Sequence, residues 1–145
     1  MRNLTDGGCA PVIVVLGAWT GEVPGATIVV NDDWTNGMGS SLRTGLTAVT
    51  ALPGVERVVV TLVDLPGLTP AAVRRIVDTS APICVATYEG RRGHPVAFAR
   101  AHWPAVAASA VGDTGARGFL RGRDDVTWVE VGDVADGYDV DEPAE

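Results

Sequence analysis

The stretch VVVTLVDLPGLTP, from Val58 to Pro70, decides the fold of this 145-residue chain. Its run of β-branched residues leads into Asp64, and Pro66 then interrupts the pattern. This order predicts a buried strand, a turn and a helix that is capped by Thr69. Open α/β sheets bind ligands beyond the carboxyl ends of their strands, so Asp64 is the first candidate functional residue.

An acidic segment near the carboxyl end of the chain suggests a partner for Asp64. It contains Asp136, Asp139 and Asp141. Carboxylates are oxygen ligands of the kind that Mg²⁺ prefers, so these acids together suggest a divalent metal and a phosphate substrate. The ordinary alternative is a solvated acidic run, because the metal site requires the chain to fold back toward Asp64.

Strand and helix patterns alternate along the chain. The strand patterns cover Pro11 to Gly17, Thr27 to Val30, Arg57 to Val63, Pro82 to Thr87, Pro95 to Phe98 and Val126 to Val131. The helical patterns cover Ser41 to Leu52, a segment beginning at Pro70, Ala101 to Val111 and Gly115 to Leu120. This alternation predicts one α/β domain over residues 1–145, with a mostly parallel sheet layered by helices. Pro95 predicts that its strand lies at a sheet edge.

Composition narrows the class of protein. A net charge of -7 argues against non-specific nucleic-acid binding, and 46% hydrophobic residues suffice for a core. Cys9 and Cys84 lack metal or redox spacing, which favours reduced thiols in a cytoplasmic protein. No signal peptide is visible, and the apolar run from Val12 to Leu16 is too short for a bilayer, so no membrane partner is expected.

Three more loops carry candidate residues. The segment NDDWTNGMGSS, residues 31–41, opens a helix whose free N–H groups suit phosphate, although a capped helix gives the same pattern. RRGHP, residues 91–95, is either a substrate-binding turn or a solvated basic turn. In GDTGAR, residues 112–117, Asp113 suits a helix cap and Arg117 is placed to reach an anion.

In chain order, NDDWTNGMGSSL, LVDLPGLTP, GRRGHPVAF, GDTGAR and DVDEP resemble the MobA-like NTP transferases of molybdenum-cofactor biosynthesis. The resemblance is strongest to the molybdenum cofactor cytidylyltransferase type and runs from about Pro11 to Pro143. It implies a Rossmann-like three-layer sandwich of the nucleotide-diphospho-sugar transferase type. It also implies a Mg²⁺-dependent reaction in which the molybdopterin phosphate attacks the α-phosphorus of a nucleoside triphosphate and pyrophosphate leaves.

The resemblance also implies a role for each candidate residue. The implied catalytic residues are Asp64, His94 and Arg117, and the implied magnesium ligands are Asp64, Asp141 and, as second choice to Asp141, Asp139. The residues implied to bind the nucleotide are Gly37, Gly39, Ser40, Ser41, Leu65 and Pro66. Those implied to line the molybdopterin side are Gly93, Pro95, Asp113 and Gly115.

One part of the family pattern has no counterpart. The family begins with a strand, a glycine-rich phosphate loop and a Lys, whereas all eleven basic residues here are Arg. Met1 to Ala10 resembles the end of the helix before the family's second strand, so an N-terminally truncated domain is expected.

The sequence leaves three functions open. In the first, which the resemblance implies, the chain transfers CMP, or GMP as the alternative, to molybdopterin. Otherwise it is an impaired relative that delivers nucleotide or pterin cofactor to a partner enzyme, or a transferase acting on a sugar phosphate. An exposed sheet edge predicts a homo-oligomer, and the resemblance implies a molybdoenzyme as another possible partner.

Overall fold

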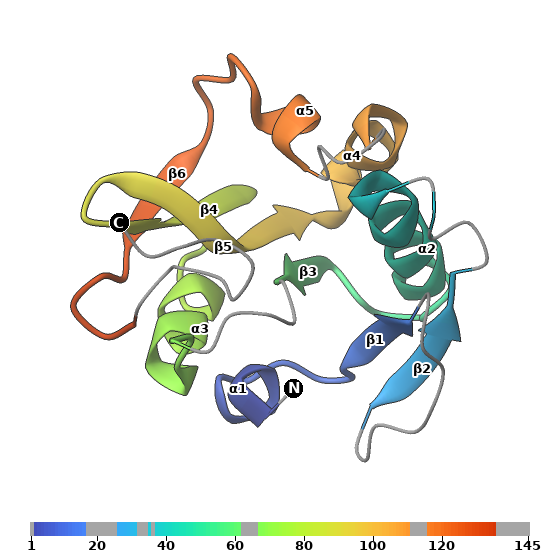
Figure 1. The fold of residues 1–145 in the computed structure, drawn as a ribbon, viewed down its shortest axis with the longest axis horizontal. Helices are drawn as coiled ribbons and strands as arrows, with labels where there is room; N and C mark the ends of the chain where they lie inside the picture. The colour runs from blue at the N-terminus through green and yellow to red at the C-terminus, as the bar shows by residue number, and fades with distance from the viewer. Residues whose placement is uncertain are drawn as a thin grey trace. The chain divides into compact units, whose positions relative to one another are not determined.

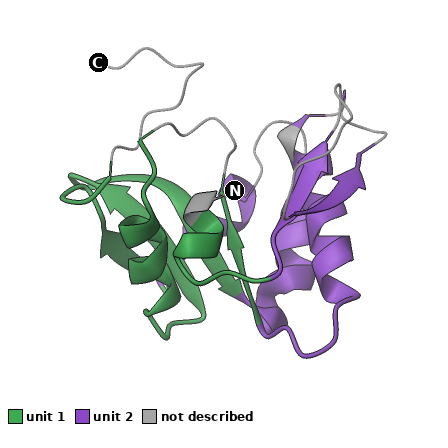
Figure 2. Ribbon diagram, turned by 90° about the horizontal axis from the view of Figure 1, so that it is seen from below, with its two compact units in different colours: residues 1–10, 57–98, 125–145 green, residues 11–56, 99–124 purple. Residues whose placement is uncertain are grey.

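A computed structural model describes residues 2–16, 26–31, 35, 37–61, 67–110 and 116–135 of the chain. The chain divides into two compact units, which Figure 2 distinguishes by colour. Unit 1 comprises residues 1–10, 57–98 and 125–145, and unit 2 comprises residues 11–56 and 99–124. The single domain and the N-terminal truncation expected from the sequence stay predictions.

Unit 1 is built on a four-stranded sheet with the strand order β3-β5-β4-β6. Its strands are β3 (Arg57–Val60), β4 (Ile83–Tyr88), β5 (Arg91–Ala99) and β6 (Thr127–Glu130). Its helices are α1 (Arg2–Asp6) and α3 (Pro70–Val77), which are labelled in Figure 1. β4 pairs with β5 in antiparallel fashion and with β6 in parallel fashion.

The prediction of a mostly parallel sheet is therefore wrong, because the sheet of unit 1 is mixed. The cause is a tight turn at Glu89 and Gly90, whose φ angles of 55° and 82° lie in the left-handed region. Two consecutive residues with positive φ form a tight turn whose twist matches the right-handed twist of the two strands of a hairpin. β5 consequently returns beside β4 instead of crossing over through a helix.

The prediction that Pro95 marks an edge strand is also wrong. β5 lies between β3 and β4, and Pro95 is buried within it. The register explains how an interior strand accommodates a proline. Val85 pairs with Val96 and Thr87 with Arg92, so the ladder is irregular around Pro95. A residue without an N–H group is tolerated at such a bulge.

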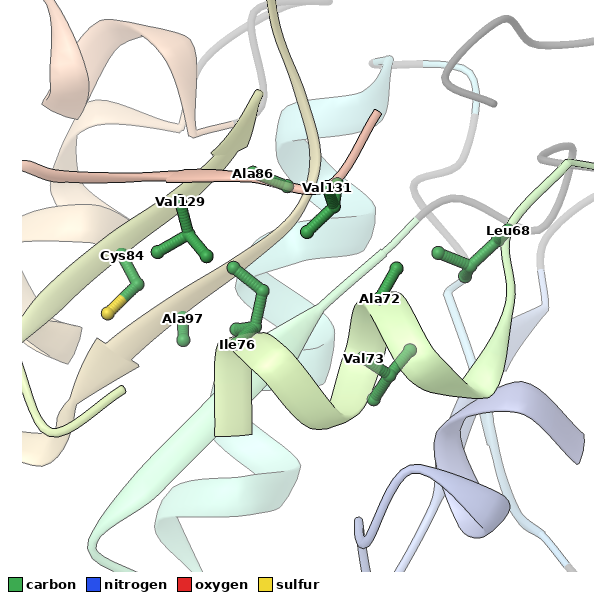
Figure 3. Close-up of a cluster of buried hydrophobic side chains, with 9 residues drawn as sticks. All are labelled: Leu68, Ala72, Val73, Ile76, Cys84, Ala86, Ala97, Val129 and Val131. Atoms are coloured by element: carbon green, nitrogen blue, oxygen red, sulfur yellow. The ribbon is translucent and has the colours of Figure 1, made fainter. Parts of the chain in front are cut away.

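The core of unit 1 lies between α3 and the sheet. Figure 3 shows Ala72 and Ile76 pointing from α3 toward residues of the strands. The buried cluster consists of Leu68, Ala72, Val73, Ile76, Cys84, Ala86, Ala97, Val129 and Val131. The spacing of its α3 members gives that helix one apolar face. Thr69 caps α3 as predicted, since its hydroxyl oxygen accepts a hydrogen bond from the Ala72 N–H at 3.3 Å.

Unit 2 combines a parallel pair of strands with helices. β1 (Ile13–Leu16) pairs with β2 (Thr27–Val30), and α2 (Met38–Thr50) packs on both strands. α2 also packs against α4 (Trp103–Ser109), which follows the short 3-10 helix η2 (Arg100–His102) and contacts α5 (Arg117–Leu120). The buried side chains of this unit include Leu46, Val49, Trp103, Val106, Phe119 and Leu120. None of the helices in the described ranges has the length and apolar character needed to cross a membrane.

Candidate functional site

The predicted site residues that the structure describes fall in both compact units. Gly37, Gly39, Ser40, Ser41 and Arg117 belong to unit 2, and Gly93, His94 and Pro95 belong to unit 1. The remaining predicted residues lie outside the described ranges: Asp64, Leu65, Pro66, Asp113, Gly115, Asp139 and Asp141. The roles of both groups stay predictions.

The predicted nucleotide loop leads into the amino end of α2. Gly37 is the residue before the helix, and its φ of 93° explains why glycine occupies this position. The Ser40 hydroxyl donates a hydrogen bond to the Gly37 carbonyl oxygen at 2.8 Å, and the Ser40 N–H bonds the same oxygen at 3.2 Å. α2 has no side-chain cap, so its first turn directs backbone N–H groups outward.

Asn31 organises this loop, although the sequence analysis did not select it as a site residue. It is 3% exposed, and its side-chain amide donates hydrogen bonds to the hydroxyls of Ser40 at 2.9 Å and Ser41 at 3.0 Å. Its backbone N–H bonds the Leu16 carbonyl oxygen at 2.7 Å. Asn31 thereby fixes the amino end of α2 to the end of the β1–β2 pair. The Ser40 hydroxyl is buried within this network, and the backbone N–H groups at the start of α2 are candidate phosphate donors.

Gly93, His94 and Pro95 form the bulge of β5. Gly93 and His94 are half-buried, whereas Pro95 is fully buried. The hydroxyl of Tyr88 donates a hydrogen bond to the carbonyl oxygen of His94. The bulge thus holds the His94 backbone at the surface of unit 1, in an orientation that the regular ladder would not give.

Arg117 is the first residue of α5, as the sequence predicted for its position near a helix start. Its side chain is exposed, so an anion can reach it from solution. A guanidinium group forms paired hydrogen bonds with phosphate or carboxylate oxygens.

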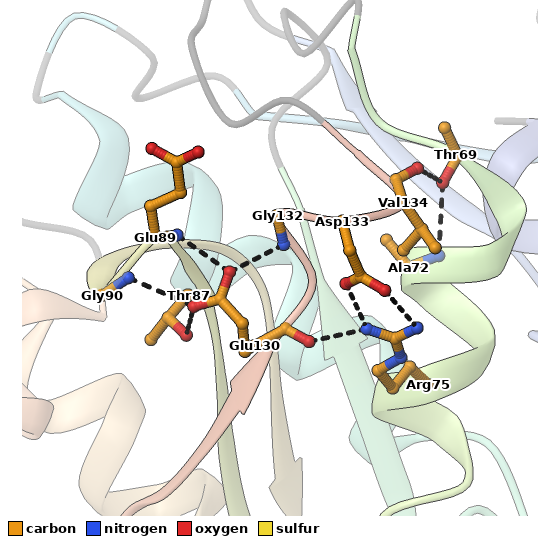
Figure 4. Close-up of polar contacts among 10 residues, drawn as sticks. All are labelled: Thr69, Ala72, Arg75, Thr87, Glu89, Gly90, Glu130, Gly132, Asp133 and Val134. Atoms are coloured by element: carbon orange, nitrogen blue, oxygen red, sulfur yellow. Dashed lines mark hydrogen bonds and ion pairs between the residues drawn. The ribbon is translucent and has the colours of Figure 1, made fainter.

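The three predicted metal ligands, Asp64, Asp139 and Asp141, lie outside the described residues. Within the described ranges, no group of three or more His, Cys, Asp or Glu side chains is placed to hold a metal ion. The chain segments next to the predicted ligands are described, however. The Thr69 hydroxyl donates a hydrogen bond to the Val134 carbonyl oxygen at 2.7 Å (Figure 4).

Glu130 is a second polar residue that the sequence analysis missed. Its carboxylate accepts hydrogen bonds from the N–H groups of Glu89 at 2.8 Å, Gly90 at 3.1 Å and Gly132 at 2.9 Å. The Thr87 hydroxyl donates a further one at 2.9 Å, as Figure 4 shows. These donors, led by the N–H groups of Glu89 and Gly90, lower the pKa of Glu130 to about 2. The carboxylate therefore fixes the β4–β5 turn to the end of β6.

Arg75 ties the same segment to α3. Its guanidinium donates to both oxygens of Asp133, at 2.7 and 3.2 Å, and to the Glu130 carbonyl oxygen at 2.8 Å. The hydrogen bond from Arg75 lowers the pKa of Asp133. Both side chains are exposed, so this pair contributes orientation more than stability.

The two cysteines are free thiols. Burial raises the pKa of Cys9, while the charges of Arg57 and Arg74 act in the opposite direction. Cys84 is buried in the core of unit 1, where its sulfur accepts a hydrogen bond from Arg57 at 3.2 Å. Both environments suit structural thiols.

Comparison with known proteins gives one family. Residues 1–127 match the family described as the MobA-like NTP transferase domain. The chain is 38% identical, over 97% of its length and 75% of the relative's, to the nicotine blue oxidoreductase of Paenarthrobacter nicotinovorans.

Solved structures share the fold. Rv0371c of Mycobacterium tuberculosis, crystallised as a complex with manganese, has a TM-score of 0.77 and 29% identity over 90% of this chain and 73% of that one. A nucleotidyl transferase from Methanothermobacter thermautotrophicus has a TM-score of 0.73 and 20% identity over 90% of this chain and 67% of that one. The second likeness concerns the fold alone.

Proposed function

The chain belongs to the family of MobA-like NTP transferase domains, and from this premise we propose that it transfers CMP to molybdopterin. The nucleoside triphosphate is the donor, with GTP as the alternative to CTP, and pyrophosphate is the second product. The hydrogen bond between Thr69 and Val134 carries the proposal. It joins the chain shortly after Asp64 to the chain shortly before Asp139, which supports convergence of the two acidic segments.

A divalent metal suits the proposed donors. Asp64 and Asp141, with Asp139 as the alternative, would supply carboxylate oxygens of the kind that Mg²⁺ binds together with substrate phosphates. The manganese in the Rv0371c crystal structure supports a divalent ion in a related protein. When bound, such an ion supplies positive charge against the triphosphate.

The protein's own groups would orient the reactants. Backbone N–H groups at the start of α2 suit the phosphates of the nucleotide, on the loop that Asn31 and Ser40 hold in place. Arg117 would bind an anionic group of either substrate. His94 would contact the molybdopterin side. Nucleotidyl transfer depends mainly on positioning and charge stabilisation, so these groups suffice without a strong base.

Release of pyrophosphate from CTP or GTP in the presence of molybdopterin tests the proposal. We expect Asp64→Asn to lower the rate by about a hundredfold or more, because it removes one charged metal ligand. Asp6→Asn, the same change on the exposed surface of α1, is the matched control and should keep the rate. Equal rates for the two variants would contradict the assignment of Asp64.

Two other functions are tested by the same assay. The 38% identity to a relative named nicotine blue oxidoreductase favours a redox reaction of that compound. Loss of the blue colour with NADH or NADPH, without pyrophosphate release from CTP, would establish it. Alternatively, the chain delivers the pterin cofactor to a partner enzyme. Tight molybdopterin binding without either reaction would identify such a carrier.

A further inference from the structure

We propose that Tyr88 is a positioning residue that sets the backbone of Gly93, His94 and Pro95 and thereby the direction of the His94 imidazole. The described contacts restrain the backbone that carries the imidazole. What the imidazole binds, the molybdopterin side of the reaction, rests on the proposed function.

Tyr88 contacts this segment at two points. Its hydroxyl donates a hydrogen bond to the carbonyl oxygen of His94. Its ring lies against Gly93 so closely that a Cβ atom there would be 3.0 Å from Cε2 and 3.2 Å from Cδ2. A side chain at position 93 would therefore press on the ring, which would have to move slightly. The ring and the hydroxyl together restrain two consecutive residues.

The restraint acts where the ladder between β4 and β5 is irregular. Val85 pairs with Val96 and Thr87 with Arg92, so a single β4 residue, Ala86, faces the whole bulge of β5. A bulge interrupts the ladder and redirects the side chains that it carries. The conformation of the bulge then depends on side-chain contacts, and Tyr88 supplies one of them.

Tyr88 is itself held in place. It is the last residue of β4 and packs against the buried cluster of unit 1. The next two residues, Glu89 and Gly90, donate their N–H groups to the Glu130 carboxylate. The backbone of Tyr88 also lies close to Gly132, since a Cβ atom on Gly132 would be 3.4 Å from the Tyr88 Cα atom. The aromatic ring therefore projects from a fixed backbone.

Tyr88→Phe is the direct test, because it removes the hydroxyl and keeps the ring. The chain contains two histidines, so the imidazole NMR spectrum has one signal set from His94 in unit 1 and one from His102 in unit 2. We expect the His94 signals to shift or broaden and the His102 signals to stay. We also expect KM for molybdopterin to rise about five- to tenfold, with kcat and KM for CTP within about twofold, as for one lost hydrogen bond.

Gly93→Ala is the second variant. It displaces the ring while keeping the hydroxyl, and it should move the same His94 signals. Trp128→Phe, on an exposed aromatic of β6 in the same unit, is the control and should leave them in place.

Unchanged His94 signals in both Tyr88→Phe and Gly93→Ala would overturn the proposal. A uniform fall in kcat with unmoved His94 signals would overturn it as well, because Tyr88 would then serve the fold alone. Displaced His94 signals in a protein that releases no pyrophosphate would support the positioning role and reject the proposed function.

Discussion

The hydroxyl groups of Thr61 and Thr69 have opposite surroundings. Thr61 Oγ1 is buried and has no hydrogen-bond partner in the described part of the chain. Thr69 Oγ1 accepts from the Ala72 N–H and donates to the Val134 carbonyl oxygen. A buried polar group without a partner costs stability, whereas a helix cap contributes to it.

Replacement of each threonine by valine should therefore change stability in opposite directions. We expect Thr61→Val to raise the free energy of unfolding by about 1 kcal/mol, because it removes an unpaired hydroxyl. Thr69→Val should lower it by about 1–2 kcal/mol through loss of the cap and of the bond to Val134. Urea denaturation measures both changes, and each variant is the control for the other. A destabilised Thr61→Val protein would show that its hydroxyl has a partner.

The low pKa of Glu130 predicts how acid affects stability. The pKa is about 2 in the folded protein, below its ordinary value of 4.5. The stabilisation from the charged carboxylate is therefore fully present above pH 4.5 and is lost as the pH falls through about 2. Thermal unfolding between these pH values should show a weaker dependence on pH for Glu130→Gln than for the wild type.

Glu89→Gln is the matched control for that experiment. Figure 4 shows the Glu89 side chain pointing away from the Glu130 carboxylate. Only the backbone N–H of Glu89 donates a hydrogen bond to that carboxylate. This variant should keep the acid dependence of the wild type. If the wild type, Glu130→Gln and Glu89→Gln all show the same acid dependence, that dependence arises from other carboxylates.

Sequence patterns did not identify Glu130 or Asn31 as organising residues. Apart from Gly132, the partners of Glu130 come from β4 and the turn after it, 40–43 residues earlier in the chain. Asn31 bonds serines of the following helix. The spacing of neighbouring residues in the sequence does not predict such contacts. Thr69 was predictable because a cap bonds the helix that directly follows it.

At the scale of elements, the strands and helices of the described ranges were largely predictable, but the antiparallel direction of β5 was not. β2 has the predicted bounds, and α2 begins a few residues before the predicted Ser41. The expectation of a mostly parallel sheet did not allow for the hairpin between β4 and β5, which turns at Glu89 and Gly90. Apolar periodicity identifies an element, whereas its direction in the sheet follows from turn geometry.

Arg57 stabilises the carboxyl end of α3 from the neighbouring strand β3. Its guanidinium donates to the carbonyl oxygens of Val77 at 2.8 Å and Ile76 at 3.0 Å, which are among the free carbonyls at a helix end. A positive charge there also interacts favourably with the helix dipole.

Arg57→Met should therefore lower the free energy of unfolding by about 1–3 kcal/mol, because it leaves these carbonyls without charged donors. Hydrogen exchange should show the largest loss of protection at the carboxyl end of α3. Arg91→Met, at an exposed position of β5, should change stability by less than about 0.5 kcal/mol. Equal effects of the two substitutions would contradict a specific role of Arg57.

At the scale of the whole molecule, the net charge of -7 opposes binding of a nucleoside triphosphate. A divalent ion offsets this repulsion by neutralising part of the phosphate charge. CTP with Mg²⁺ should therefore raise the melting temperature, as any ligand of the folded state does. CTP with EDTA should raise it much less. Equal shifts under both conditions would contradict metal-assisted nucleotide binding.

The two compact units are assembled from alternating stretches of the chain, and the chain passes between them after residues 10, 56, 98 and 124. A terminal deletion series would therefore remove parts of both units in turn, and no single cut yields either one intact. Mapping of an activity to one unit would need internal replacements within it, or co-expression of several complementary fragments.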